Sequence, residues 1–177
     1  MKRYNNILDT DQLVKKLKKE DAYYLRLVKM MQYIYWALIP IYMFLAIREY
    51  SIDGVMEDAI GSIFYMFSLL IFAIVFRKFY KEYNNVDYSM PVLQMLKKAE
   101  KRYRPFTLKT LWLYFGVLLM DFGIYFNTSL DYTFWEVQLY YGGMILAATA
   151  IGYIVYLSKY KTIRDNAKRL IREIENG

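Results

Sequence analysis

The chain of 177 residues contains no cysteine and no histidine. The absence of cysteine excludes disulfide bonds and thiolate metal sites. The absence of histidine removes the side chain that most often acts as a general base or binds a metal. We also find no Gly-rich loop followed by Lys-Ser or Lys-Thr, the pattern that binds nucleotide phosphates. We therefore predict a protein that is not an enzyme and that uses no cofactor and no metal.

Charged residues are missing from long parts of the sequence. Three stretches contain no Asp, Glu, Lys or Arg: 30–47, 59–76 and 137–158. A fourth, 108–128, contains Lys109 at its start and Asp121 within it. A helix needs ~20 mainly apolar residues to cross ~30 Å of hydrocarbon, and an isolated apolar run of this length spans a membrane only as a helix. The sequence predicts an all-α integral membrane protein with four transmembrane helices in a bundle.

The basic residues lie almost entirely in alternate segments between these spans. Residues 1–29 contain eight Lys or Arg, 77–109 contain nine and 159–177 contain six, together 23 of the 24 in the chain. By contrast, 48–58 contains one base and four acids, and 131–136 contains no base. Loops rich in Lys and Arg remain on the cytoplasmic side. We therefore predict a multi-pass protein of the cytoplasmic membrane whose two termini and middle loop are cytoplasmic.

The two halves of the sequence are similar at a nearly constant offset. Three short segments recur 79 or 80 residues later: Tyr4-Asn5-Asn6-Ile7 as Tyr83-Asn84-Asn85-Val86, Leu17-Lys18-Lys19 as Leu96-Lys97-Lys98, and Tyr80-Lys81 as Tyr160-Lys161. One register held over several segments indicates an internal duplication. Both copies begin on the same side, so they are predicted to be parallel repeats of a helical hairpin.

Each repeat has a predicted order of helices. The first, 1–82, has a basic amphipathic helix at about 11–29 and spans at about 30–47 and 59–76. The second, 83–177, has an amphipathic helix at about 90–104, spans at about 108–128 and 137–158, and a C-terminal helix at about 159–175.

Local signals mark helix starts, breaks and a candidate modification site along the chain. Ser89 and Pro91 predict the start of its amphipathic helix, and Arg104-Pro105 predicts a break before the third span. Pro40 predicts a kink in the first span. The tripeptide 127–129, Asn-Thr-Ser, matches a glycosylation acceptor on the outer side.

The three basic segments, here called the arms, carry apolar residues at helical spacing. In the first arm these are Val14, Leu17, Tyr24, Val28 and Met31, with Asp21 interrupting the stripe. In the second arm they are Val92, Leu96, Ala99 and Tyr103, and in the C-terminal arm Tyr160, Ile163, Ala167, Leu170 and Ile174. Steps of three and four residues place such side chains on one helical face.

Two arrangements are open for the arms. They lie apolar face down on the inner leaflet, where each Lys gains ~1 kcal/mol near anionic lipids, or they pack together or dock a cytoplasmic protein. We expect the C-terminal arm to pack within the protein and the other two to lie on the membrane. The side chains predicted to contact lipid or a partner are Lys15, Lys16, Lys18, Lys19, Lys97, Lys98, Lys101 and Arg102. No nucleic-acid binding is expected, because topology already accounts for these charges.

Asp121 is the one acid well inside a predicted span. An intramembrane carboxylate costs ~2.5–3.5 kcal/mol on insertion scales, so it usually faces a bundle interior or water. No span contains a base to pair with it there, so we expect a neutral partner. Tyr125 lies one turn along, Tyr42 holds the equivalent place in the first repeat, and Ser68, Thr149 and Gln138 supply further hydroxyls and amides. Asp121 holds helices together, lies hydrated and without a role near the outer interface, or lies on a proton or cation pathway.

Small residues recur at four-residue spacing in the fourth span. The pairs are Gly143 with Ala147 and Ala148 with Gly152, and the third span offers Gly116 and Gly123. Small residues allow helices to approach closely in a membrane. These faces are predicted to pack within the chain or to form a seam between copies in a homo-oligomer.

Two functions follow from these features. The arms make up roughly half of the sequence, which favours a scaffold or regulatory protein that acts through basic cytoplasmic helices. The alternative is a small transporter or channel that uses Asp121 on a path between the two repeats.

Overall fold

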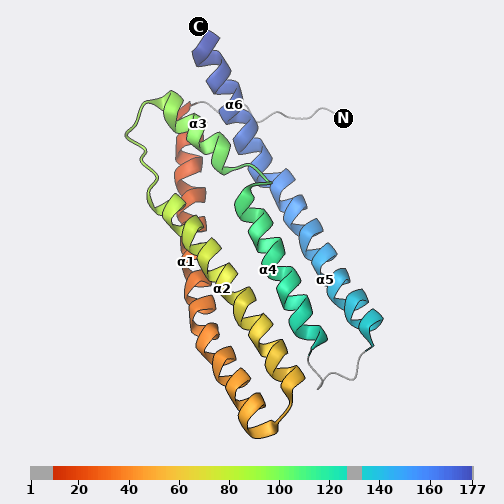
Figure 1. Ribbon diagram of the computed structural model, residues 1–177. Helices are drawn as coiled ribbons and strands as arrows, with labels where there is room; N and C mark the ends of the chain where they lie inside the picture. The colour runs from red at the N-terminus through yellow and green to blue at the C-terminus, as the bar shows by residue number, and fades with distance from the viewer. Residues whose placement is uncertain (1–9, 127–132, 177) are drawn as a thin grey trace. The chain divides into compact units, whose positions relative to one another are not determined.

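The computed structural model describes residues 10–126 and 133–176, and these form helices joined by short connections, with no strand (Figure 1). Four of the helices are long and apolar enough to cross a membrane, in agreement with the four predicted spans. The glycosylation tripeptide 127–129 and the end of the third predicted span lie outside the described residues.

Helix α1 (Thr10–Arg48) joins the first arm and the first span without interruption, and it continues through Pro40. Its 39 residues correspond to about 58 Å at ~1.5 Å per residue, against ~30 Å of hydrocarbon. A π-helical turn, η1 (Glu49–Asp53), follows, and α2 (Met56–Asn84) returns. Gly54 has a φ of 68° between them, a left-handed conformation that a residue without Cβ adopts at little cost.

The second arm and the third span are separate helices. Helix α3 (Val92–Arg102) begins after Pro91, and α4 (Leu108–Tyr125) begins after Thr107, whose side chain accepts a hydrogen bond from the Thr110 amide. The predicted break at Arg104-Pro105 is therefore confirmed. A proline ring disfavours helical backbone in the residue before it, which accounts for the interruption.

The last span and the C-terminal arm form a continuous helical segment. Helix α5 (Phe134–Val155) passes through a π-helical turn, η2 (Tyr156–Tyr160), into α6 (Lys161–Asn176). The residues that flank η2 keep right-handed helical backbone angles, so the direction of the chain is not reversed there.

The chain divides into two compact units, which we describe separately. The arm unit consists of Met1–Leu25, Tyr83–Pro105 and Ala148–Gly177, and the span unit consists of Arg26–Glu82 and Phe106–Ala147. The boundaries fall within helices α1, α2 and α5, so the spans and the arms share these helices.

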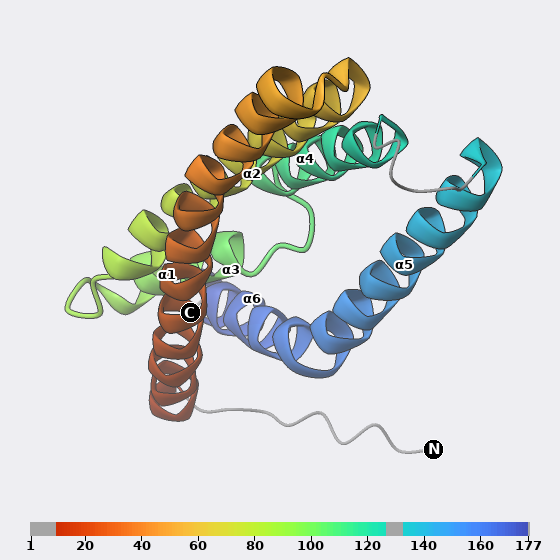
Figure 2. The ribbon, with the colours of Figure 1, turned by 90° about the horizontal axis from the view of Figure 1, so that it is seen from below.

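In the span unit α2 and α4 lie side by side (Figure 2) because glycines remove the side chains between them. A Cβ built on Gly61 would lie 2.9 Å from the Gly123 oxygen, and one built on Gly116 would lie 2.7 Å from the Phe72 ring. The hydroxyl of Ser68 donates to the Gly116 oxygen at 2.7 Å. Gly116 and Gly123 therefore serve helix packing within the chain, one of the two predicted uses.

The small residues of the fourth span do not take part in this packing. A Cβ built on Gly143 or Gly152 meets no atom within 4 Å, and Ala147 and Ala148 are exposed. Of the two predicted uses, the described structure shows no close packing within the chain at Gly143 and Gly152, and a seam between copies stays a prediction. The close helix contact instead uses Gly61 of α2, which the spacing analysis did not select.

Candidate functional site: the arm unit

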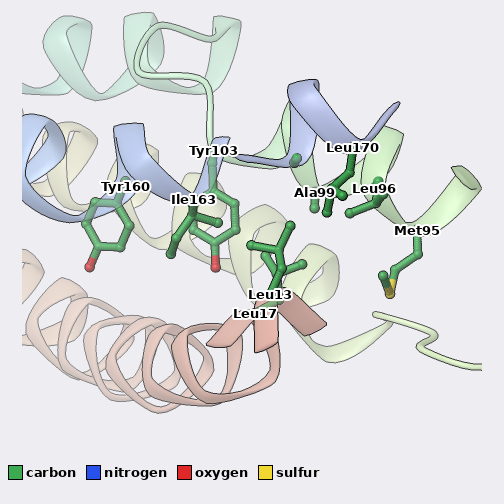
Figure 3. Packing of buried hydrophobic residues seen from close by; sticks show 10 residues of the cluster. Leu13, Leu17, Met95, Leu96, Ala99, Tyr103, Tyr160, Ile163 and Leu170 are labelled. Carbon is green, nitrogen blue, oxygen red and sulfur yellow. The ribbon is translucent and has the colours of Figure 1, made fainter. Parts of the chain in front are cut away.

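The apolar faces of all three arms meet in one core (Figure 3). Leu13 and Leu17 of α1 contribute to it, together with Leu96 of α3 and Ile163 of α6, and each of these four is 0% exposed. The remaining members are Met95, Ala99, Tyr103, Tyr160, Ala167 and Leu170. The expected packing of the C-terminal arm is confirmed. The expectation that the other two arms lie apolar face down on lipid is wrong, because these faces are buried in protein.

The observed core differs in detail from the predicted stripes. Leu13 is fully buried whereas Val14 is only half-buried, and Ile174 at the end of α6 is 45% exposed. Val92 is 43% exposed because it opens α3. The stripes therefore predicted the buried faces to within about one residue, and they failed at the helix ends, where neighbouring helices no longer cover them.

Asp21 lies at the centre of a buried polar network. Its carboxylate accepts hydrogen bonds from the hydroxyls of Tyr103 at 2.8 Å and Tyr88 at 2.6 Å. Its Oδ2 also lies 3.1 Å from the Arg102 guanidinium, and the two side chains of this ion pair are 4% and 6% exposed. Asp21 comes from α1, whereas its partners come from α3, its C-cap and the preceding loop. The network thus ties segments 67–82 residues apart in sequence.

Sequence reasoning did not identify this network, although it noted Asp21 as an interruption of the apolar stripe. An acid on a buried face needs a partner, because an unpaired charge in a low-dielectric interior is costly. That requirement was a signal in the sequence that Asp21 has a buried partner. The sequence did not identify the partners, because nothing in the spacing relates Asp21 to Tyr88, Arg102 or Tyr103.

The network keeps its tyrosines neutral. Burial raises the pKa of Tyr103 well above its ordinary value of 10.0, and the negative charge of Asp21 raises it further. Burial and the hydrogen bond to Asp21 likewise raise the pKa of Tyr88. Both phenols therefore remain proton donors to Asp21 at neutral pH.

The rings of four tyrosines contact one another across the seam between the arms, in two stacked pairs and one tilted pair. The ring of Tyr24 lies 5.3 Å from Tyr83 and 5.3 Å from Tyr160, and Tyr160 lies 5.8 Å from Tyr103. Aromatic pairs at such separations stabilise a contact by ~0.5–1.5 kcal/mol beyond their buried area. Burial also raises the pKa of Tyr24. In addition to the Asp21 network, these ring contacts connect α1, α2 and the start of the C-terminal arm.

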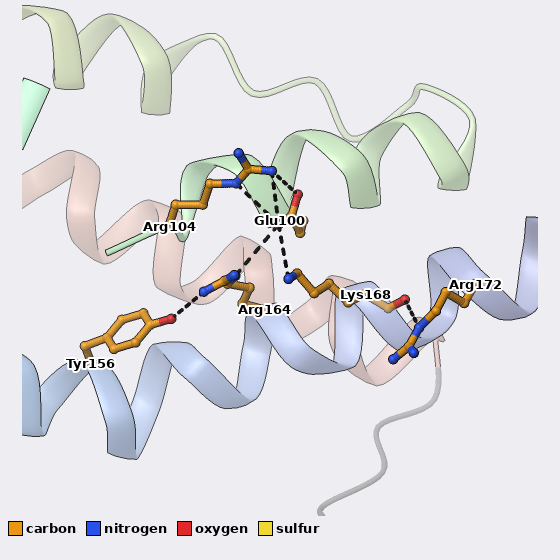
Figure 4. Close-up of polar contacts among 6 residues, drawn as sticks. All are labelled: Glu100, Arg104, Tyr156, Arg164, Lys168 and Arg172. Atoms are coloured by element: carbon orange, nitrogen blue, oxygen red, sulfur yellow. Dashed lines mark hydrogen bonds and ion pairs between the residues drawn. The ribbon is translucent and has the colours of Figure 1, made fainter. Parts of the chain in front are cut away.

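Two further carboxylates hold the arms together by ion pairs. Glu20 of α1, which is 7% exposed, lies 2.8 Å from Lys159 of η2. Glu100 of α3 contacts three cations (Figure 4): Arg104 at 3.1 Å, and Arg164 and Lys168 of α6 at 3.8 Å each. The hydrogen bond from Arg104 and the surrounding positive charges lower the pKa of Glu100. Glu100 therefore remains ionised between the two helices.

Most of the lysines predicted to contact lipid or a partner are at the surface. Lys15, Lys18, Lys19, Lys98 and Lys101 are exposed and Lys16 is half-buried. The ammonium of Lys18 lies 5.3 Å from the centre of the Tyr88 ring, and Lys97 pairs with Glu175 at 2.6 Å. Arg102, predicted with them, is not at this surface, because it is buried against Asp21.

Asp121 in the span unit binds a neutral partner, as predicted. The side-chain amide of Gln138 donates to both of its oxygens, at 3.1 and 3.0 Å. The nearby Tyr141 hydroxyl donates to the Val117 oxygen at 2.8 Å. Gln138 belongs to the first turns of α5 and Asp121 to the last turns of α4, so the pair lies toward one end of these spans.

The other two residues of the predicted intramembrane site are placed elsewhere. Tyr125 is 54% exposed and packs edge-on against Phe134. Tyr42 of α1 packs against the Tyr65 ring of α2.

The described contacts of the arm unit combine a buried apolar core with ion pairs and exposed lysines at its surface. Within residues 10–126 and 133–176, no three Asp or Glu side chains gather in a way that suits a metal ion. Comparison of the chain with protein-family models, with curated proteins and with solved structures finds no match.

Proposed function

We propose that this chain is a non-enzymatic multi-pass membrane protein that acts as a scaffold or regulatory protein through its arm unit. The single observation that carries the proposal is that three arms, distant in sequence, fold together around their own apolar core and the buried Asp21 network. Lysines remain on the outside of this unit. A folded basic surface attached to four spans is suited to holding a partner at the membrane.

The sidedness of the charges supports a cytoplasmic location for the arm unit. Almost all Lys and Arg lie in the arms and the middle segment, which the positive-inside rule places in the cytoplasm. The order of arm, span and span occurs in both halves, which supports two parallel hairpin repeats assembled as a bundle. The halves differ at one join, since α1 is continuous whereas α3 and α4 are separate.

Photo-crosslinking in native membranes tests the proposed function. A photoreactive amino acid is placed at Lys19 or Lys101, both exposed on the arm unit, and at Leu111, which is 61% exposed in the third span, as a control. We expect a discrete protein adduct from the arm positions and lipid adducts from Leu111. The adduct should be lost in Leu17→Asp, which places a charge in the arm core. Lipid adducts alone from all three positions would contradict a scaffold role.

The Asp121–Gln138 pair favours a second candidate function, a small transporter or channel. A carboxylate within a span is a candidate for a proton or cation pathway, and here the side chain from the adjacent span that hydrogen-bonds to it is neutral. In reconstituted vesicles, such a protein should show a proton or cation flux that Asp121→Asn abolishes and Tyr42→Phe leaves unchanged. Absence of flux for protons, common cations and small solutes would leave Asp121 a structural residue.

A further inference from the structure

An open groove of about 520 Å³ runs between α3 and α6 of the arm unit. It is lined by Lys97, Glu100, Lys168, Ile171 and Arg172. The two helices are held together beneath it by the arm core, to which Leu96 and Leu170 belong. The groove is therefore part of a fixed surface.

The groove contains more positive charge than its own carboxylate balances. Three of its five lining residues are basic and one is acidic, and Lys97 is also paired with Glu175 at 2.6 Å. Glu100 is already shared among Arg104, Arg164 and Lys168 (Figure 4). The Nε of Arg172 donates to the main-chain oxygen of Lys168 at 3.4 Å. Because this oxygen carries no net charge, the hydrogen bond does not neutralise the guanidinium of Arg172. A concave site with excess charge of one sign concentrates ligands of the opposite sign.

The position of the groove along the helix argues against a lipid headgroup as its ligand. Lys168 and Arg172 come ten and fourteen residues after Ser158, the end of the predicted fourth span, in a helical segment that continues to Asn176. At ~1.5 Å per residue these positions lie roughly 15 and 21 Å along the helix. The polar headgroup region extends only ~5–8 Å beyond the hydrocarbon on each side.

We propose that this groove binds an acidic peptide segment of a soluble protein, with side-chain carboxylates of the peptide against Lys168 and Arg172. This inference rests on the proposed function and names the chemistry of the partner. Ile171 supplies an apolar floor for the methylene groups of the acidic side chains. Glu100 limits the affinity, because its negative charge faces the same space.

Fluorescence anisotropy with labelled octaglutamate tests the proposal on the full chain in phosphatidylcholine nanodiscs. We expect wild type to bind at low ionic strength and the double variant Lys168→Glu/Arg172→Glu to bind about tenfold or more weakly. The matched control is Lys15→Glu/Lys19→Glu, which makes the same charge change at exposed positions of α1 outside the groove. It should weaken binding by no more than about twofold.

A third variant is expected to increase the affinity for octaglutamate instead of lowering it. Glu100→Gln removes the negative charge of the groove and should tighten octaglutamate binding by about two- to threefold. Tighter binding distinguishes the charge effect of Glu100 from a simple loss of the binding surface, and hydrogen exchange on α3 and α6 checks that the variant remains folded. Weaker binding in Glu100→Gln, equal weakening in the two double variants, or no binding by wild type would each overturn the proposal.

A competition experiment separates the peptide from a lipid headgroup. Glycerophosphoserine at the same concentration should leave the octaglutamate complex intact, and displacement would overturn the assignment to an acidic peptide. Crosslinking from Lys101 does not depend on the groove. If the adduct from Lys101 persists while octaglutamate fails to bind, the groove proposal fails and the scaffold role stands. If no arm position gives an adduct, the scaffold role itself fails.

Discussion

Asp21 illustrates how one residue organises the arm unit. On a helical face otherwise made of Leu, Val and Tyr, its carboxylate is 4% exposed and meets a guanidinium and two phenols. A buried ion pair contributes little net stability compared with apolar residues of the same shape. The observed pairing of α1 with α3 brings the carboxylate, the guanidinium and both phenols together, although the Nε of Arg102 is buried there without a hydrogen-bond partner.

The first prediction concerns loss of the Asp21 carboxylate. Asp21→Ala leaves the charge of Arg102 buried without its partner, and removing one member of such a pair costs ~3–5 kcal/mol. We expect a loss of this size in the unfolding free energy of the arm unit, measured by denaturant titration of the full chain in detergent with hydrogen exchange on α1, α3 and α6.

A double-mutant cycle provides the control. Arg102→Met should also destabilise the unit, whereas the double variant Asp21→Ala/Arg102→Met should cost less than the sum of the two single changes. Strict additivity would show that the two side chains do not act as a pair.

The second prediction concerns alkaline pH. The pKa of Tyr103 is raised in the folded chain above its ordinary value of 10.0, so the unfolded chain ionises this phenol first. The stability that this group contributes is fully present below pH 10.0 and falls as pH rises above it. The thermal midpoint of the arm unit should decline above this pH. Tyr103→Phe should start from a lower midpoint and show a shallower decline, and an unchanged slope would contradict the assignment.

At the scale of the elements, close helix contact in the span unit depends on backbone that lacks side chains. Gly61 of α2 and Gly123 of α4 approach so closely that a Cβ on Gly61 would lie 2.9 Å from the Gly123 oxygen. Apolar burial gives no driving force between helices in lipid, so such contacts rely on dispersion and on hydrogen bonds such as Ser68 to Gly116.

The third prediction compares glycines in two spans. Gly61→Ala should destabilise the span unit by ~1–3 kcal/mol, because a backbone atom cannot move aside for the new methyl group. Gly143→Ala should be neutral or should stabilise α5 by up to ~1 kcal/mol, since no atom lies within 4 Å of the added Cβ and alanine favours the helix. Thermal unfolding in detergent measures both. A destabilised Gly143→Ala would indicate that this face packs against another chain.

At the scale of the whole molecule, charge and hydropathy together carry the proposed orientation of the chain in the membrane. The four spanning helices alternate with segments that are either strongly basic or nearly free of bases. Each additional Lys or Arg near the end of a span favours the cytoplasmic side. With an even number of spans, this rule supports the proposal that both termini lie on that side.

The fourth prediction tests this topology, and the absence of native cysteine makes the test specific. Ser51→Cys, exposed in η1, should react in intact cells with a thiol reagent that does not cross membranes. Asn85→Cys, exposed after α2, should react only after the membrane is opened. Reaction of Asn85→Cys in intact cells would overturn the orientation and the cytoplasmic location proposed for the arm unit.

The sequence by itself determined those features that depend on local composition. Four charge-free or nearly charge-free runs were enough to predict four spanning helices, because hydrocarbon requires about 20 apolar residues in a helix. Arg104-Pro105 was enough to predict the break between α3 and α4, because the effect of proline on its neighbour is steric and local. The apolar stripes predicted which faces of the arms are buried, to within about one residue.

Only the tertiary structure decided what covers those faces. The sequence pattern of an apolar helical stripe is the same whether lipid or protein covers it. The stripes alone therefore did not show that Leu17, Leu96 and Ile163 meet in one core. The partners of Asp21 and the groove beside Glu100 depend on contacts between residues far apart in sequence. Such contacts are determined by how the helices pack together, which no local spacing encodes.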